Sequence, residues 1–145
     1  MIIYTIGFTK KSAEDFFEQI AQEGIEVLID TRLNNQSQLA GFSKGKDLPY
    51  FLERLANCGY RYEKSYTPTK DILNDYKKGV ISWADYEIKY YDLIRTRNMV
   101  NDFIEKYSNY SKVVVLCSEN TPEHCHRRLL VDEIAKIVDC EIIHL

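Results

Sequence analysis

The sequence predicts an α/β protein, a three-layer α/β/α domain with a mainly parallel sheet of about four to five strands. Short apolar runs rich in valine and isoleucine alternate with longer segments of helical periodicity. Serine, threonine or glycine stands at many of the boundaries between them. Such alternation is typical of a parallel sheet with helices on both faces. We expect a single α/β domain over residues 1–145, which is long enough to bury a core of its own.

The beginning of the chain has the pattern of a βαβ unit. Residues 2–7 (IIYTIG) are apolar and β-branched and end at a glycine, which predicts a buried strand. Ser12 can cap a helix that ends at Gly24, with acidic residues in its first turn. Residues 26–32 (EVLIDTR) predict a second buried strand that ends on charged side chains. The connection between two such parallel strands is almost always right-handed.

The next part of the chain is predicted to contain a loop, a helix and a short strand. Residues 33–47 are polar and contain glycine, as loops do. A helix is expected to begin near Leu48 and to be closed by Gly59. Residues 60–64 (YRYEK) then predict a short strand at the edge of the sheet.

Residues 66–110 are predicted to be helical, with a short helix followed by a longer one that Ser82 caps. A break in the longer helix is expected near Arg97–Asn98. Tyr86 and Tyr90 fall on its apolar face. We therefore expect these tyrosines to pack inside the protein or at a homodimer contact rather than to stack on nucleic-acid bases.

The end of the chain repeats the strand–helix–strand pattern. Residues 112–119 (KVVVLCSE) form the clearest apolar run and predict a strand. Thr121, followed by proline and glutamate, has the signature of a helix start, and the helix is expected to run to residue 139. Residues 140–145 (CEIIHL) predict the last strand. The side chains expected on the buried face of the helix are Leu129, Leu130, Ile134, Ile137 and Val138.

In parallel sheets, ligands bind at the carboxyl ends of the strands. The segments to weigh for function are therefore Gly7 to Lys10, Asp30 to Arg32 and Cys117 to Arg128. Gly7 allows a close approach of the backbone to a ligand, and Thr9 beside it is a further candidate contact. No GxGxxG pattern is present, which excludes a standard NAD-binding loop.

The third of these segments is crowded with cysteine, histidine and arginine. If its helix begins at Thr121, Cys125 lies in the first turn, where Cys125 and His126 face the sheet. Arg127 and Arg128 then point to solvent or to a ligand. A thiol in such a turn, near arginines, has a lowered pKa, and the free helix amides favour an anion. The alternative is a capped helix with a partly buried Cys–His pair.

Phosphatase-type and redox chemistry are two candidates for this segment. A phosphatase-type or rhodanese-type loop needs an arginine at a fixed spacing from its cysteine. Six residues after Cys117 and Cys125 stand Glu123 and Val131 instead, so that signature fails. A redox couple of Cys117 and Cys125 stays open, although its spacing is not that of a thioredoxin motif.

Metal binding and catalysis are the other two candidates. Cys117, Cys125 and His126 could bind zinc, with Glu119 or Asp30 as a further ligand. Against zinc, no CxxC pair is present, and adjacent residues of a helix rarely reach the same ion. The remaining hypothesis is nucleophilic or acid–base catalysis by Cys125 or His126 on an anionic ligand.

Asp30 and Arg32 stand at the end of the second predicted strand. They either form a buried salt bridge with each other or act separately at a site. In the second case, Asp30 orients His126 or a ligand hydroxyl, and Arg32 binds a carboxylate or phosphate with its planar fork.

Composition limits the compartment and the partners. The net charge of −3 argues against a generally basic nucleic-acid or membrane-surface protein. No apolar run approaches the ~18 residues of a membrane span, and the first residues do not resemble a signal peptide. We therefore expect a cytoplasmic protein without membrane contact, whose four cysteines are free, catalytic or metal-bound. Basic residues outnumber acidic ones six to three from Arg32 to Lys64, which indicates either solvated loops or a polyanion-binding face.

Four segments occur in order across nearly the whole chain: YTIGFTKKSAEDFFEQI, VLIDTRLNNQS, GFSK and LCSENTPEHCHRRLLVDEI. In these segments the chain resembles the bacterial and archaeal family called domain of unknown function 488. That family has a TIGHS-like first turn, a VDVR-like strand end and a C-x-E…P-x-x-CHR junction. Two departures are Phe8, where the family has histidine, and YTPTKD, where it has a glycine pair. The resemblance implies a fold and a site rather than a reaction. The site residues that it implies are Asp30, Arg32, Cys117, Glu119, Cys125, His126 and Arg127.

Three functional hypotheses follow. The first is a Cys/His-dependent enzyme of unknown reaction that acts on a phosphorylated, nucleotide-like or nucleic-acid ligand. In it, Cys125 or His126 reacts, Arg32 and Arg127 hold the anion, and an acidic side chain orients the reacting group. The second is a non-catalytic module that binds nucleic acid or protein. The third is a metal-sensing or redox-sensing thiol protein.

Overall fold

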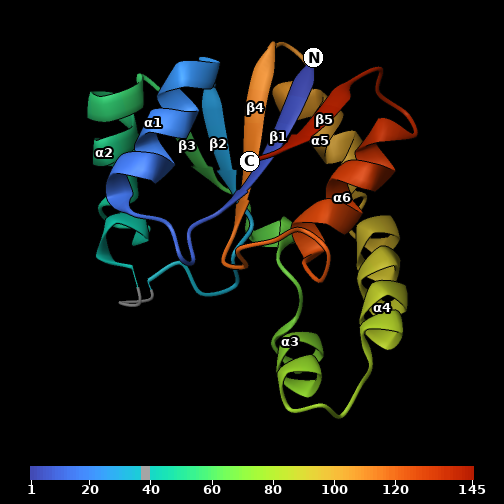
Figure 1. Cartoon of the computed structure of the whole chain (residues 1–145). Coiled ribbons are helices and arrows are strands. Elements are labelled where there is room, and N and C mark those ends of the chain that lie inside the picture. The colour runs from blue at the N-terminus through green and yellow to red at the C-terminus, as the bar shows by residue number, and fades with distance from the viewer. Residues whose placement is uncertain (37–39) are drawn as a thin grey trace.

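A computed structural model describes residues 1–36 and 40–145 of the chain. Its sheet has five strands in the order β3-β2-β4-β1-β5, and every neighbouring pair is parallel. Helices cover both faces (Figure 1), so the predicted three-layer α/β/α fold is confirmed. The strands are β1 (Ile2–Gly7), β2 (Val27–Asp30), β3 (Gly59–Tyr62), β4 (Lys112–Cys117) and β5 (Glu141–His144).

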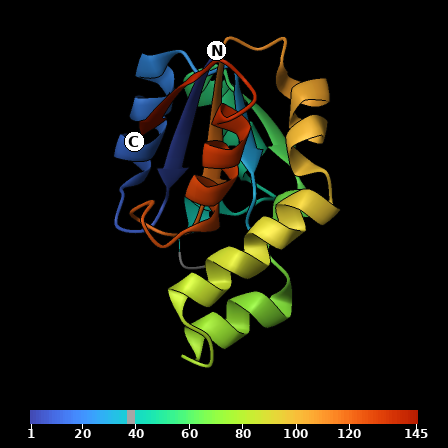
Figure 2. The same ribbon diagram turned by 90° about the vertical axis from the view of Figure 1, so that its right-hand side faces the viewer.

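The helices form two groups on opposite faces of the sheet. On one face lie α1 (Ala13–Glu23) and α2 (Leu48–Ala56). On the other lie α4 (Trp83–Thr96), α5 (Met99–Tyr107) and α6 (His126–Ala135). The short α3 (Lys70–Lys77) and the first turns of α4 extend beyond the carboxyl edge of the sheet, as Figure 2 shows. Two 3₁₀ turns, Gly41–Ser43 and Lys64–Tyr66, complete the helical segments of the described residues.

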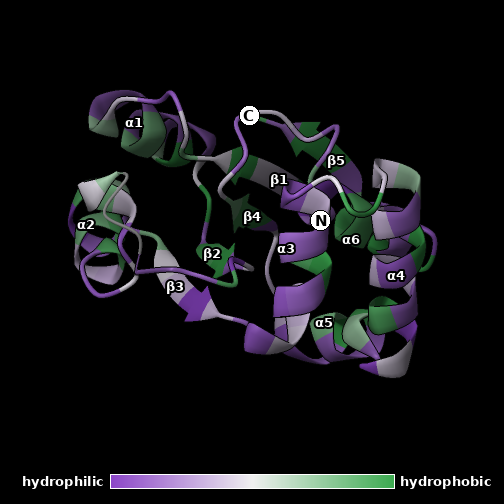
Figure 3. Cartoon of the chain, turned by 90° about the horizontal axis from the view of Figure 1, so that it is seen from below, coloured by the Kyte–Doolittle hydropathy of each residue, from purple (hydrophilic) through white to green (hydrophobic). Residues whose placement is uncertain are grey.

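The alternation of side chains along each strand divides the core into two parts. Leu28 packs with the cluster under α1 and α2, whereas Val27 and Ile29 pack with the cluster under α4, α5 and α6. β4 divides in the same way, with Val114 in the first cluster and Val115 in the second. Figure 3 shows the hydrophobic colouring of β2 and β4 between the helical layers, with mostly hydrophilic residues in α3.

Most predicted boundaries are confirmed. Ser12 accepts a hydrogen bond from the Asp15 amide at the start of α1, and Gly24 ends that helix in the left-handed region with φ 64°. The expected break of the long helix lies at Asn98, whose φ is 54°, and it separates α4 from α5. Gly59 does not close α2, however. Asn57 adopts the left-handed conformation there, and Gly59 opens β3.

Ser82 gives a test of how local sequence fixes these boundaries. Its side chain accepts a hydrogen bond from the Asp85 amide, and the Asp85 carboxylate accepts one from the Ser82 amide, which forms a capping box. We expect Ser82→Ala to lower the free energy of unfolding by about 1 kcal/mol, measured by urea denaturation. The control is Ser108→Ala, at the carboxyl end of α5. This change should alter the free energy of unfolding little, because the side chain of a serine at that end accepts no hydrogen bond from a helix amide. Equal losses in both variants would contradict the assigned cap.

The largest departure from the sequence-based prediction is the start of α6. The helix begins at His126 and not at Thr121, and it ends at Ala135. Cys125 is extended, with φ −140° and ψ 138°, so it interrupts any helix that would start at Thr121. Thr121 and the proline after it lie in a bend, and Glu123 and His124 form a turn before the helix. Ile137, expected on the buried face, lies beyond the helix and is 69% exposed.

Two further findings complete the fold. The predicted loop of residues 33–47 includes residues 37–39, which lie outside the described residues, and the remainder contains the first 3₁₀ turn. Within the described ranges, every helix is too short or too polar to cross a membrane.

Candidate functional site

Three strands deliver side chains to one place at the carboxyl edge. Gly7 at the end of β1 pairs with Cys117 at the end of β4, and β2 runs along the other side of β4. By strand alternation, Cys117 follows Val115 onto the face that α6 covers, and Thr31 follows Ile29 onto the same face. Asp30 lies between these positions and points to the opposite face.

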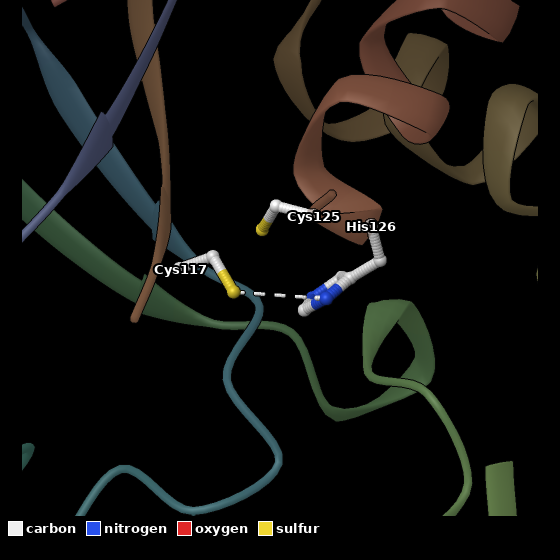
Figure 4. A group of neighbouring side chains, drawn as sticks. All are labelled: Cys117, Cys125 and His126. Carbon is white, nitrogen blue, oxygen red and sulfur yellow. Dashed lines mark hydrogen bonds between the residues drawn. The ribbon is translucent and has the colours of Figure 1, made fainter. Parts of the chain in front are cut away.

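Cys117, Cys125 and His126 form a compact Cys/His cluster at this edge (Figure 4). Their sulfur atoms and a ring nitrogen all lie within 4.8 Å of one another, and all three residues are buried. The Sγ atom of Cys117 is 3.6 Å from Nδ1 of His126. The sulfur of Cys125 points toward the same space because its extended backbone turns that side chain toward the sheet.

Thr31 fixes the orientation of the His126 ring. Nε2 of His126 is 2.8 Å from the Thr31 carbonyl oxygen and 3.1 Å from its Oγ1 atom. Because a carbonyl only accepts, Nε2 carries a hydrogen and donates it to Thr31, which leaves Nδ1 facing Cys117. The ring of Tyr90 packs edge-on against His126. Sequence reasoning missed Thr31, although the alternation along the VLIDTR segment places it on this face.

The pKa values of the two cysteines in the cluster are shifted in opposite directions. The neighbouring Cys125 thiol lowers the pKa of Cys117 well below its usual value, and His126 and Arg127 act in the same direction. Burial and the neighbouring Cys117 raise the pKa of Cys125 well above its usual value. Burial lowers the pKa of His126, but Cys117 and the Thr31 carbonyl outweigh burial, so the net pKa is raised. The expected low pKa therefore belongs to Cys117 and not to Cys125.

From the sequence, Arg127 was expected to point to solvent or to a ligand, and the structure excludes solvent exposure. Its side chain is fully buried, and NH1 donates to the Glu119 carbonyl at 2.7 Å and to the Cys125 sulfur at 3.5 Å. Its Nε and NH2 atoms have no hydrogen-bond partner among the described residues. The guanidinium therefore sets a positive charge beside the sulfur atoms. Arg128 is more exposed and pairs with Glu87 and Asp132.

Gly7 and Thr9 shape the loop that follows β4. A Cβ atom on Gly7 would lie 1.7 Å from the Glu119 carbonyl oxygen, so only glycine allows this approach. The hydroxyl and the amide of Thr9 both donate to the Ser118 carbonyl. Both residues were predicted to contact a ligand, and the structure places them against the loop backbone. The Glu119 side chain itself is exposed at the rim.

Asp30 and Arg32 form a buried, two-pronged ion pair. Nε and NH2 of Arg32 donate to the two carboxylate oxygens of Asp30 at 2.9 and 2.8 Å, and both side chains are almost fully buried. The Tyr60 hydroxyl donates to the same carboxylate at 2.6 Å, and the Arg32 guanidinium lies over the ring of Phe8. Asp30 therefore binds Arg32 and does not orient His126.

A pocket of about 110 Å³ opens at the cluster. The three cluster residues, Arg32 and Glu119 all line it. Its other walls include residues of α3, Tyr86 of α4 and His124, none of which the sequence analysis named as a site residue. Trp83 stacks on Tyr86 and contacts His124, which joins α4 to the loop before α6. The residues that reach the pocket from α3 are Leu73, Tyr76 and Lys77.

The fold and the cluster together define an α/β protein with a Cys/His cluster at the carboxyl edge of an all-parallel sheet. The chain belongs to the family described as "Domain of unknown function DUF488", whose family model matches residues 12–134. The resemblance seen in the sequence is thereby confirmed. No curated protein and no solved structure matches the chain.

Proposed function

We propose that this protein is a Cys/His-dependent enzyme that acts on a small anionic ligand bound in the pocket. Cys117 is the nucleophile, and His126 holds and returns the proton. The observation that carries the proposal is the 3.6 Å approach of the Cys117 sulfur to Nδ1 of His126, at the wall of the pocket. A thiol next to a histidine whose other nitrogen is fixed is the usual arrangement of an activated nucleophile.

The residues around Cys117 support its role as the nucleophile. Thr31 holds the histidine ring in place through its carbonyl group. Arg127 supplies a buried positive charge beside the two sulfur atoms, and a thiolate is the natural partner for that charge. Cys125, at the start of α6, places a second sulfur atom within 4.8 Å of the reacting one.

The size of the pocket and the helix start beside it favour an anion. Among the described lining residues, Lys77 balances the acidic Glu119, and the charge of Arg32 is paired with Asp30. The first amides of α6 are close by, at the positive end of the helix dipole. A volume of about 110 Å³ suits a compact group such as a phosphate or a carboxylate. This is consistent with a phosphorylated or nucleotide-like ligand whose larger part stays outside.

Selective alkylation of the metal-free protein tests this proposal. We expect iodoacetamide to modify Cys117 before the other cysteines, as mapped by peptide mass spectrometry, and millimolar inorganic phosphate to protect it. Cys140 and Cys58 are internal controls in the same chain. Burial raises the pKa of Cys140, and it raises that of Cys58 to about 12, so both should react more slowly.

His126→Gln separates activation from simple access. Hydrogen bonds to charged groups contribute about 1.5–3 kcal/mol, so we expect this change to slow alkylation of Cys117 roughly tenfold or more. The rate at Cys140 should stay the same. Faster modification of Cys140 than of Cys117 in the native protein, or an unchanged Cys117 rate in His126→Gln, would refute the proposal.

The hypotheses of a nucleic-acid-binding or protein-binding module, a homodimer and a cytoplasmic location stay predictions, as does the single-domain organisation.

A further inference from the structure

We propose that the Cys/His cluster binds one soft divalent metal ion, Zn²⁺, and that the ion competes with the ligand of the pocket for Cys117. The ion needs only the two sulfur atoms and Nδ1 of His126. Its binding is therefore independent of the enzymatic function proposed above, and only the competition depends on it.

The backbone at Cys125 removes the main objection to such a site. Two adjacent residues inside a helix point in different directions and rarely reach the same ion. Cys125, however, is extended and precedes the helix, whereas His126 is its first residue. The two side chains consequently converge on the sulfur of Cys117, as Figure 4 shows.

The donor atoms are spaced as a tetrahedral zinc site requires. With Zn–S near 2.3 Å and Zn–N near 2.0–2.1 Å, donor atoms lie about 3.5–3.8 Å apart. The observed separation of Cys117 Sγ and His126 Nδ1 is 3.6 Å, and no pair of the three donors is more than 4.8 Å apart. Small rotations of the cysteine side chains are therefore enough to close the site around an ion.

The hydrogen bonds that two of the donor residues make are those that zinc ligands usually make. A histidine that binds metal through one nitrogen donates the other N–H to a carbonyl or carboxylate, which fixes the ring. His126 does this through Nε2 to the Thr31 carbonyl at 2.8 Å. Arg127 donates to the Cys125 sulfur and sets a positive charge beside it, which opposes the burial that raises the pKa of this thiol. These contacts are a second observation, independent of the donor spacing.

The fourth position of the ion would face the pocket. Three protein ligands with one open position are typical of zinc sites that exchange a water or a small ligand. Glu119 and His124 also line the pocket. Their carboxylate and imidazole groups are of the kinds that bind zinc, so either side chain is a candidate for the fourth ligand. An ion held in this way occupies the sulfur of Cys117 and prevents it from acting as a nucleophile.

Metal titration of the full chain tests the inference. The protein is freed of metal with a chelator, kept reduced, and titrated with Zn²⁺ against a chromophoric chelator. We expect one equivalent to bind with submicromolar affinity. Co²⁺ should give the thiolate-to-cobalt charge-transfer absorption of a tetrahedral site. Substituting a residue that only hydrogen-bonds to a metal ligand typically lowers metal affinity by roughly 10–100-fold. Cys125→Ser removes a ligand itself, so it should weaken Zn²⁺ binding by more than that. Cys140→Ser should leave Zn²⁺ binding unchanged.

A measurement on the unaltered protein guards against a misfolded variant. Zn²⁺ should protect Cys117 from iodoacetamide, and chelation should restore the reactivity of this thiol. Absence of one-equivalent binding or of the cobalt charge-transfer band would overturn the metal site and leave the proposed enzymatic function standing. Zinc binding together with a Cys117 that stays inert in the metal-free protein would overturn the enzymatic function instead.

Discussion

Replacing Asp30 with asparagine is expected to lower the free energy of unfolding by about 3–5 kcal/mol. Asp30 is the countercharge of Arg32, and both side chains are almost fully removed from water. The substitution leaves the guanidinium buried without a charged partner, and it also removes the carboxylate that accepts the Tyr60 hydroxyl. Urea denaturation followed by circular dichroism measures the loss.

Two comparisons isolate the cause of this loss. The exposed pair of Asp92 and Arg95 provides the matched control, since Asp92→Asn should cost no more than about 1 kcal/mol. The double variant Asp30→Asn/Arg32→Met should recover part of the stability, because it removes the unpaired charge. If Asp30→Asn behaved like Asp92→Asn, Arg32 would have another partner, and our description of this ion pair would be wrong.

Gly7→Ala is expected to destabilise the protein by about 1–3 kcal/mol and to disturb the Cys/His cluster. The added Cβ atom would meet the Glu119 carbonyl oxygen at 1.7 Å, and that oxygen is held by the Arg127 guanidinium. The Glu119 carbonyl belongs to the backbone and not to the end of a flexible side chain, so the loop after β4 has to move. Because Cys117 directly precedes this loop, its position changes with it.

Gly41→Ala is the control for that experiment. Among the described residues, a Cβ atom at Gly41 would have no neighbour within 4 Å, so this variant should keep nearly full stability. In Gly7→Ala, both the alkylation rate of Cys117 and the Zn²⁺ affinity should fall under conditions where the protein is still folded. Retention of both properties would show that the loop tolerates the extra carbon, against the close contact described here.

The sequence predicted the fold well because its signals are local. Apolar β-branched runs mark all the central strands, and Ser12 and Ser82 cap helices where their positions suggest. The edge strand β3 was also placed correctly. The prediction was wrong where one local sequence pattern is compatible with two backbone structures. Thr121 and the proline after it lie in a bend here and do not start the helix, and Asn57 takes the left-handed position expected of a glycine.

The site was predicted in outline but not in its contacts. The carboxyl-edge rule brought Cys117, Cys125 and His126 into one group, and the structure gathers them. The rule does not say which face of the sheet a side chain takes, and so Asp30 was considered for the role that Thr31 has. The contribution of α3 and α4 to the pocket depends on packing between distant segments, which no local pattern encodes.

The place of β4 in the sheet also determines when the chain can fold during synthesis. β4 lies between β1 and β2, yet those two strands are complete by Asp30, whereas β4 begins only at Lys112. A nascent chain that has not reached Lys112 therefore lacks the strand that joins them, and their edges stay unpaired. Folding around β4 must wait until the ribosome has made the chain through Cys117. Protection of these exposed edges by a chaperone on the ribosome would then matter more for this protein than for one whose strands pair in sequence order.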